Sequence, residues 1–165
     1  MSIEIEAEEK EFWHVKRLVR MALFIALGAV GGLIPLPSPT GTVGLDSAPG
    51  YFLALFAGGV EGAIVLGVGH VVSSLKAGFP LGPIHIPIAI MMGGCGLLFA
   101  FLAKQFNLIA AAVVGTLVNG VIISALLIPW LGMGLFVGLT PMLLVASTVN
   151  ILIAILIYRI FERAS

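Results

Sequence analysis

The sequence predicts an all-α membrane protein with six transmembrane helices, the second of them short or partial. Of its 165 residues, 60% are apolar and only 10% are charged, whereas soluble domains carry roughly 25% charged residues. The mean hydropathy is +1.19. Because a transmembrane helix takes about 20 residues, the length accommodates five or six such helices. A β-barrel would alternate apolar and polar residues along short segments, and the chain shows no such alternation.

Six apolar segments, separated by glycine, proline and polar residues, define the predicted helices. They span residues 18–34, 49–57, 61–77, 84–104, 108–128 and 139–161. We assign residues 1–16 to an acidic N-terminal segment and residues 17–163 to a single helical membrane domain. Trp13 and Lys16, at the end of the acidic segment, are of the types enriched at the membrane boundary.

The first helix contains two pairs of small residues, Ala22 with Ala26 and Gly28 with Gly32. Residues four apart share a helix face, and small residues let another helix approach closely. Each pair therefore predicts a packing face. The partner is either another helix of this protein or a separate subunit, and the sequence leaves both open.

The loop 35–48 is rich in proline, glycine, serine and threonine, which do not continue a helix. Asp46 or Ser47 is placed to cap the next helix, with Pro49 in its first turn. At about 1.5 Å per residue, that helix covers only half of a ~30 Å hydrocarbon core. We therefore predict a partial crossing.

Polar residues interrupt the next two helices near one end. His70, Ser73 and Ser74 fall at i, i+3 and i+4, so they share one helix face. His85 lies in the first turn of the following helix, and we expect it at a depth similar to that of His70. Because polar groups at membrane depth are costly, this cluster indicates a binding site.

The last two helices carry further polar candidates, Asn119 and Asn150. Each is either a hydrogen-bonding link between helices or a ligand contact. Two aromatic residues, Phe79 and Trp130, lie in predicted loops on the same side of the membrane. Either is placed to stack on a ring of a bound solute.

The number of crossings sets the topology. Six crossings put both termini on one side, and basic residues at the N-terminus, at Lys104 and at the C-terminus then face the cytoplasm, as the positive-inside rule prefers. Lys76 is the exception. We predict a multi-pass protein of the cell membrane with cytoplasmic termini, and with the loops 35–48, 78–83 and 129–138 outside.

Several functions lack support in the sequence. It contains no phosphate-binding glycine loop and no basic patch interleaved with aromatic residues, so ATP hydrolysis and nucleic-acid binding are not indicated. His70 and His85 lack the close spacing of a metal motif. We interpret Cys95 as a small buried hydrophobe and Glu61 as a solvated residue at the cytoplasmic end of its helix. We expect no enzymatic activity, cofactor or metal.

Short motifs along the chain suggest a family. They are Gly44-Leu45-Asp46-Ser47, Gly62-Ala63, Gly69-His70 and Gly78-Phe79-Pro80-Leu81-Gly82-Pro83. Together with the size, the six apolar segments and the Ala22/Ala26 face, they resemble the S components of energy-coupling factor (ECF) transporters over roughly residues 17–161. The sequence looks most like S components assigned to α-ribazole, a precursor of the lower ligand of cobalamin.

The resemblance implies a membrane subunit that captures a vitamin-like molecule from outside the cell. In this family the S component docks through its alanine-rich first helix, here at Ala22 and Ala26, onto a transmembrane coupling subunit that two ATPases drive. Release is attributed to toppling of the S component in the lipid bilayer. The acidic N-terminal segment is not part of the family pattern.

We therefore expect an outward-facing substrate site made by eight residues. They are Asp46, His70, Ser73, Phe79, His85, Asn119, Trp130 and Asn150. Two other functions stay open. One is a passive channel or facilitator for a small solute, and the other is a membrane assembly subunit that binds no ligand.

Overall fold

The computed structural model describes residues 14–34, 36, 38, 40 and 43–164, and every regular element in them is helical. The elements are α2 (Val15–Gly31), α3 (Ala48–Phe56), α4 (Gly59–Lys76), the 3₁₀ turn η1 (Gly82–Ile84), α5 (His85–Gln105), α6 (Leu108–Leu117), the π-helical turn η2 (Val118–Ile122), α7 (Ile123–Leu126) and α8 (Ile128–Ala164). Because α6, η2 and α7 follow one another as one rod, the described chain forms six helices. The predicted all-α fold with a short second helix is confirmed. Of the predicted acidic segment, residues 1–13 lie outside the described residues.

The short helix α3 is the centre of the bundle. It contacts α2, α4, α5 and α8, and Tyr51 and Leu53 within it are completely buried. A helix that is apolar all round is buried by neighbouring elements, and here those neighbours are other helices of the chain. Stacked rings of Phe24 and Phe52, with centroids 5.5 Å apart, join α2 to α3.

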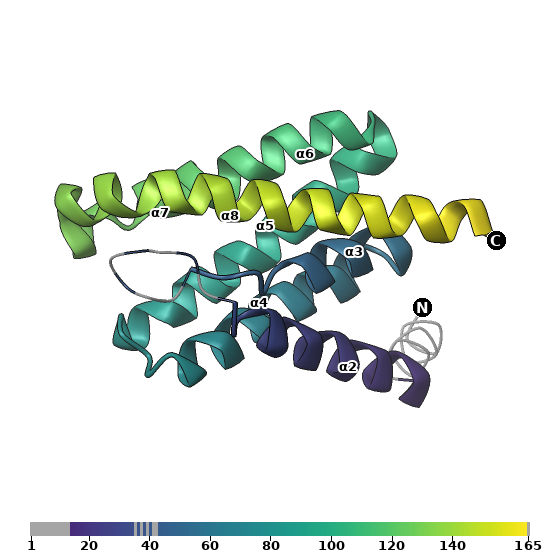
Figure 1. The fold of residues 1–165 in the computed structure, drawn as a ribbon, viewed down its shortest axis with the longest axis horizontal. Helices are drawn as coiled ribbons and strands as arrows, with labels where there is room; N and C mark the ends of the chain where they lie inside the picture. Colours follow the sequence, from purple (N-terminus) through teal and green to yellow (C-terminus); the bar gives the residue numbers. More distant parts are fainter. Residues whose placement is uncertain (1–13, 35, 37, 39, 41–42, 165) are drawn as a thin grey trace, which may run out of the picture.

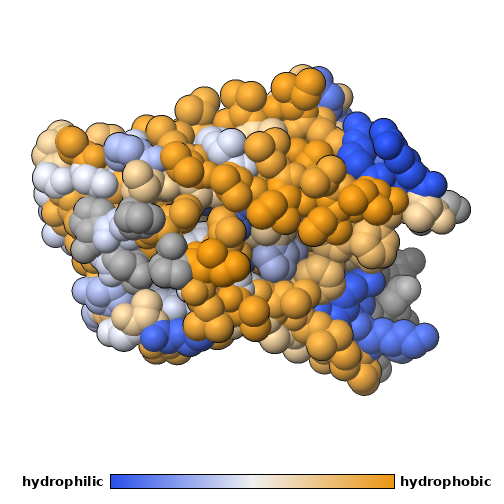
Figure 2. All heavy atoms as spheres, viewed as in Figure 1, coloured by the Kyte–Doolittle hydropathy of each residue, from blue (hydrophilic) through white to orange (hydrophobic). Residues whose placement is uncertain are grey.

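The outer surface of the bundle is suited to lipid. Three helical stretches are long and apolar enough to cross a membrane: Gly82–Gln105, Leu108–Leu126 and Ile128–Ala164. Figure 2 shows apolar side chains over most of one face, with hydrophilic residues gathered where α8 ends and α2 begins. The chain is therefore a membrane protein.

The two ends of the bundle differ. The first turn of α2 and the last turn of α8 lie together at one end (Figure 1). The end of α4, η1, α7 and the start of α8 lie at the other, together with the loop between α2 and α3. We call the second end the loop end.

The loop between α2 and α3 packs closely on α2. A Cβ atom at Gly28 would lie 2.8 Å from the carbonyl oxygen of Asp46, and one at Gly31 would overlap the carbonyl oxygen of Leu45. Only glycine lets the loop approach this closely. The Gly28 face of the first helix is therefore an internal packing face.

The predicted loop 129–138 is mostly helical. A non-helical kink at Gly132 (φ 77°, ψ 163°) separates the short helical stretch 128–131 from the long helix that runs on through Pro141 to Ala164. Glycine and proline indicate a loop in water, but in a lipid environment the backbone must satisfy its hydrogen bonds internally, so such residues are tolerated within helices. The last helix consequently starts several residues earlier than predicted and reaches over the loop end.

Candidate functional site: a cavity at the loop end

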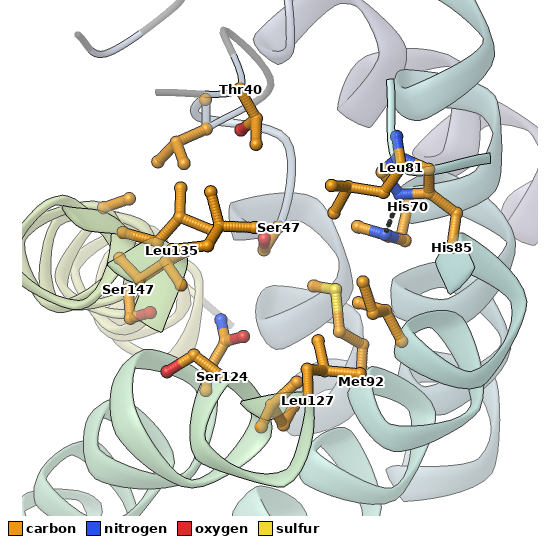
Figure 3. A pocket seen from close by; sticks show the side chains of 18 of the residues that line it. Thr40, Ser47, His70, Leu81, His85, Met92, Ser124, Leu127, Leu135 and Ser147 are labelled. Atoms are coloured by element: carbon orange, nitrogen blue, oxygen red, sulfur yellow. Dashed lines mark hydrogen bonds between the residues drawn. The ribbon is translucent and has the colours of Figure 1, made fainter. Parts of the chain in front are cut away.

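A cavity opens at the loop end between the α2–α3 loop and the helices α4, α5, α7 and α8 (Figure 3). Its free volume is about 100 Å³, and the empty space counted together with the open mouth is about 840 Å³. Its polar lining residues are Thr40, Asp46, Ser47, His70, His85, Asn119, Ser124, Ser147 and Asn150. Most of the remaining lining side chains are aliphatic, among them Ile88, Ile123, Leu127, Leu135 and Leu139, with Met92 beside them.

Five of the eight predicted site residues line this cavity: Asp46, His70, His85, Asn119 and Asn150. They come from the loop, α4, α5, η2 and α8, so the fold brings together residues that are distant in the sequence. The structure shows where these five lie, and their contact with a solute stays a prediction.

The other three predicted residues lie outside the described lining. Ser73 lies near the Asp46 side chain and beside Gly32 of α2. Phe79 packs on His85, with ring centroids 4.8 Å apart. Trp130 is 70% exposed. Its side chain is not among the described lining residues, although the next two residues, Leu131 and Gly132, are, so the predicted stacking at this position stays a prediction.

The two histidines form one hydrogen-bonded cluster with Ser74. His70 Nε2 lies 3.1 Å from His85 Nδ1 (Figure 3), and Ser74 Oγ lies 2.9 Å from the same His85 nitrogen. The i, i+4 spacing of His70 and Ser74 puts both on the face of α4 that meets the first turn of α5. The predicted similarity in depth of His70 and His85 is confirmed by their contact.

The hydrogen bonds assign the proton of the His85 ring. Ser74 Oγ donates its proton to the His70 carbonyl at 2.7 Å, so it accepts from His85 Nδ1. The backbone N–H of Leu81 donates to His85 Nε2 at 3.4 Å, so that nitrogen carries no proton. His85 is therefore neutral with its proton on Nδ1, and His70 Nε2 accepts from it.

Asn150 holds the loop to α8. Its Oδ1 accepts from the backbone N–H groups of Ser47 (3.1 Å) and Ala48 (2.8 Å), and its Nδ2 donates to the carbonyls of Gly44 (3.1 Å) and Ala146 (2.8 Å). An asparagine side chain offers two donors and two lone pairs, and all four are used. Asn150 replaces the N-terminal cap that Ser47 does not supply to α3.

The Asp46 carboxyl is partly buried next to this cap. It accepts a hydrogen bond from Ser47 Oγ at 3.0 Å. Burial raises the pKa of Asp46 above its usual 3.8, and the nearby hydroxyl groups of Ser47 and Ser73 oppose that rise. The folded protein therefore favours the neutral form of the Asp46 carboxyl more than water does.

Asn119 lies in η2, and π-helical turns occur frequently at functional sites. Its side chain lies near the hydroxyl of Tyr51, which in turn lies 3.4 Å from Cys95 Sγ. Cys95 is buried, as predicted. These contacts with α3 and α5 hold the Asn119 side chain on the side away from the cavity.

Two buried serines of the lining were not chosen from the sequence. Ser124 bonds to the carbonyls of Gly120 and Val121, whereas Ser147 Oγ has no partner among the described residues. The position of Ser147, three residues before Asn150, puts it on the same face of α8. That spacing was the sequence feature that could have identified Ser147 as a site residue. It does not single out Ser147, because many serines in helices have the same spacing to another polar residue.

Glu61 was predicted to be solvated, and this prediction is wrong. Glu61 is only 1% exposed, and its carboxylate binds Arg17 Nε at 2.8 Å, Arg20 Nη2 at 2.6 Å and Arg20 Nε at 2.9 Å. Arg17 and Arg20 lie three apart on one face of α2, and they reach the first turn of α4. Glu61 is therefore an ionic link between two helices, at the end away from the cavity.

The other small pair of α2 lies on the surface. Ala22 and Ala26 are exposed, together with Val19, Leu23 and Leu27. This face of α2 is apolar and is not covered by another described helix.

Comparison with known proteins adds a family and a fold. Residues 16–163 match the family model described as ECF transporter, substrate-specific component. A solved structure, reported as the structure and mechanism of the S component of a bacterial ECF transporter, is similar with a TM-score of 0.67 and 24% sequence identity, covering 90% of this chain and 96% of that chain. At this identity the likeness establishes the fold. No curated protein matches the chain.

Proposed function

The chain belongs to the family of substrate-specific components of ECF transporters, and we propose that it captures a small, largely apolar solute in the cavity at the loop end. The observation that carries the proposal is the cavity itself. It joins an aliphatic wall to a few buried polar groups, which is the usual make-up of a small-molecule site. Membership of this family implies association with a transmembrane coupling subunit and ATPases.

We take α-ribazole as the first candidate solute. It combines an apolar benzimidazole with the hydroxyl groups of a ribose. Met92, Ile123 and Leu127 supply an apolar surface for a ring, and His70 and Asn119 supply hydrogen-bonding groups. The motifs around Asp46 and His70 support the same candidate.

We assign the exposed Ala22/Ala26 face of α2 to the coupling subunit. Internal packing was the alternative, but both alanines lie on the surface. Small side chains on an exposed apolar face allow close approach of a helix from another subunit. The ionic link of Arg17 and Arg20 to Glu61 holds α2 against α4, which keeps this face in a fixed orientation.

We propose that both termini lie in the cytoplasm and the cavity faces outward. Lys104 and Arg159 line one hollow at the end away from the cavity, and Arg17 and Arg20 lie at the start of α2. This gathering of cations fits the positive-inside rule. Lys76 is at the loop end, where its amine donates to the Ala29 carbonyl and so helps to close the end of α2.

Titration of the purified protein with α-ribazole tests the proposal. The wild type should bind saturably, and Leu135→Trp, which places a large ring in the cavity (Figure 3), should weaken binding at least about tenfold. Val137→Trp is the matched control, because Val137 is 62% exposed on the same helix and should bind like wild type. Absence of saturable α-ribazole binding would refute this solute, and absence of binding to any vitamin or precursor would refute the solute-binding role.

A further inference from the structure

Ser147 differs from four other hydroxyl groups of the described helices. Ser74, Ser124, Thr140 and Thr148 each donate to a carbonyl one turn earlier, at 2.7–3.2 Å. Ser147 is only 2% exposed, yet its Oγ has no hydrogen-bond partner among the described residues. A buried polar group without a partner is rare and calls for an explanation.

The position of Ser147 supplies that explanation. Ser147 lines the cavity, and Figure 3 shows it beside Ser124 and across from Met92. The other buried hydroxyl without a partner among the described residues, that of Ser38, does not line the cavity as described. Ser147 is therefore a buried hydroxyl that meets the cavity and is left free to bond whatever occupies it.

The charges of the cavity limit what can occupy it. The described lining contains a carboxyl, Asp46, and no lysine or arginine, and the loop sequence 35–47 contains neither cation. His85 is held neutral by its hydrogen bonds. The first N–H groups of α3, which otherwise favour an anion, are bonded to Asn150. A buried carboxylate or phosphate of a solute would find no compensating charge.

We propose that Ser147 binds the solute directly through its hydroxyl, and that the solute carries no net negative charge. The inference rests on the proposed solute-binding function and deepens it. The Ser147 hydroxyl would select for a polar, uncharged group on the face of the solute that lies next to α8. Ser147 thus differs from Asn150, whose hydrogen-bonding groups are all used by the protein itself.

Two variants of neighbouring residues test the contact. Ser147→Ala removes the free hydroxyl, and Thr148→Ala removes an exposed hydroxyl that bonds the Leu144 carbonyl on the outer side. The purified proteins are titrated with α-ribazole and with riboflavin, two uncharged solutes, and with the 5′-phosphate of each. Their Tm without solute is measured in parallel.

Ser147→Ala should weaken binding of the uncharged solute about three- to tenfold, the range of one hydrogen bond, while Thr148→Ala stays at the wild-type affinity. The Tm of Ser147→Ala without solute should not fall, because the lost hydroxyl had no partner. The phosphate of a solute that binds should bind at least about tenfold more weakly.

Two results would overturn the inference while leaving solute binding intact. One is wild-type affinity in Ser147→Ala, and the other is a phosphate that binds as tightly as its uncharged partner. If the wild type bound neither uncharged solute, mass spectrometry of the molecule released from the purified protein would decide the charge. A released anion would overturn the inference, and no released molecule would overturn the proposed function together with it.

Discussion

Asn150 caps α3 from α8: its Oδ1 accepts from the backbone N–H of Ser47, 103 residues earlier in the chain, at 3.1 Å. The same side chain also bonds Gly44, Ala48 and Ala146. One amide therefore ties together the loop that borders the cavity, the central helix and the last helix. The part of the cavity wall that the loop and α8 form together depends on this link.

Asn150→Ala should destabilise the protein by about 2–3 kcal/mol, because it leaves buried N–H and carbonyl groups without partners. The measurement is the Tm in detergent without solute. Asn150→Asp keeps an acceptor for the two N–H groups but loses the donor to Gly44, so its Tm should lie between those of Asn150→Ala and wild type. A Tm of Asn150→Ala equal to wild type would contradict the cap.

The partly buried Asp46 carboxyl predicts a pH dependence of stability. Its pKa is raised in the folded protein, so the folded state binds this proton more tightly than the unfolded state. The contribution of Asp46 to stability should therefore be greatest below pH 3.8 and decrease as the pH rises through the folded pKa. The measurement is the Tm without solute across acidic and neutral pH.

Asp46→Asn is the variant that isolates this contribution, because His70 and His85 also titrate with pH in the wild type. The variant should gain Tm relative to wild type at neutral pH, and the difference should shrink on acidification. Parallel curves for the two proteins would show that the Asp46 carboxyl is not responsible.

Glu61→Gln should destabilise the protein by about 2 kcal/mol. It removes the buried carboxylate and leaves Arg17 and Arg20 facing an amide, although both arginines are about one-third exposed, which reduces the loss. Glu162→Gln is the control, since its ion pair with Arg159 is exposed and such pairs contribute less than ~1 kcal/mol. Equal Tm values for the two variants would contradict a special role for Glu61.

Ala22→Trp and Ala26→Trp should reduce energised uptake strongly and leave solute affinity unchanged, because a large ring on this face blocks close approach of the coupling subunit. Ile109→Trp, at a 77% exposed position on α6, should leave both unchanged. Uptake is measured in vesicles with and without the ATPase module. Uptake that needs no ATPase would favour a passive facilitator, and loss of solute affinity in the alanine variants would place this face in internal packing.

Local patterns in the sequence were enough to predict the helices. The six apolar segments, the short second helix and the shared depth of His70 and His85 follow from hydropathy and helical spacing. The start of α8 did not, because glycine and proline near Gly132 have a different meaning in lipid than in water.

The site was harder to predict because its details depend on residues that meet only in the fold. Glu61 lies 41 residues after Arg20. No local sequence pattern predicts that these two residues form an ion pair. Nothing in the sequence distinguishes Ser147, which is unpartnered, from Thr148, which bonds its own helix. Trp130 lies in the short helical stretch before the kink at Gly132 and is exposed.

Mass spectrometry of small molecules released from the purified protein tests the central claim most directly. Cells expressing wild type or Leu135→Trp are grown with α-ribazole, and the proteins are purified under identical conditions. We predict a small uncharged solute in near-stoichiometric amount with wild type and its loss from Leu135→Trp. Equal amounts of solute in both proteins would contradict binding in the cavity, and no solute in either would contradict the solute-binding function.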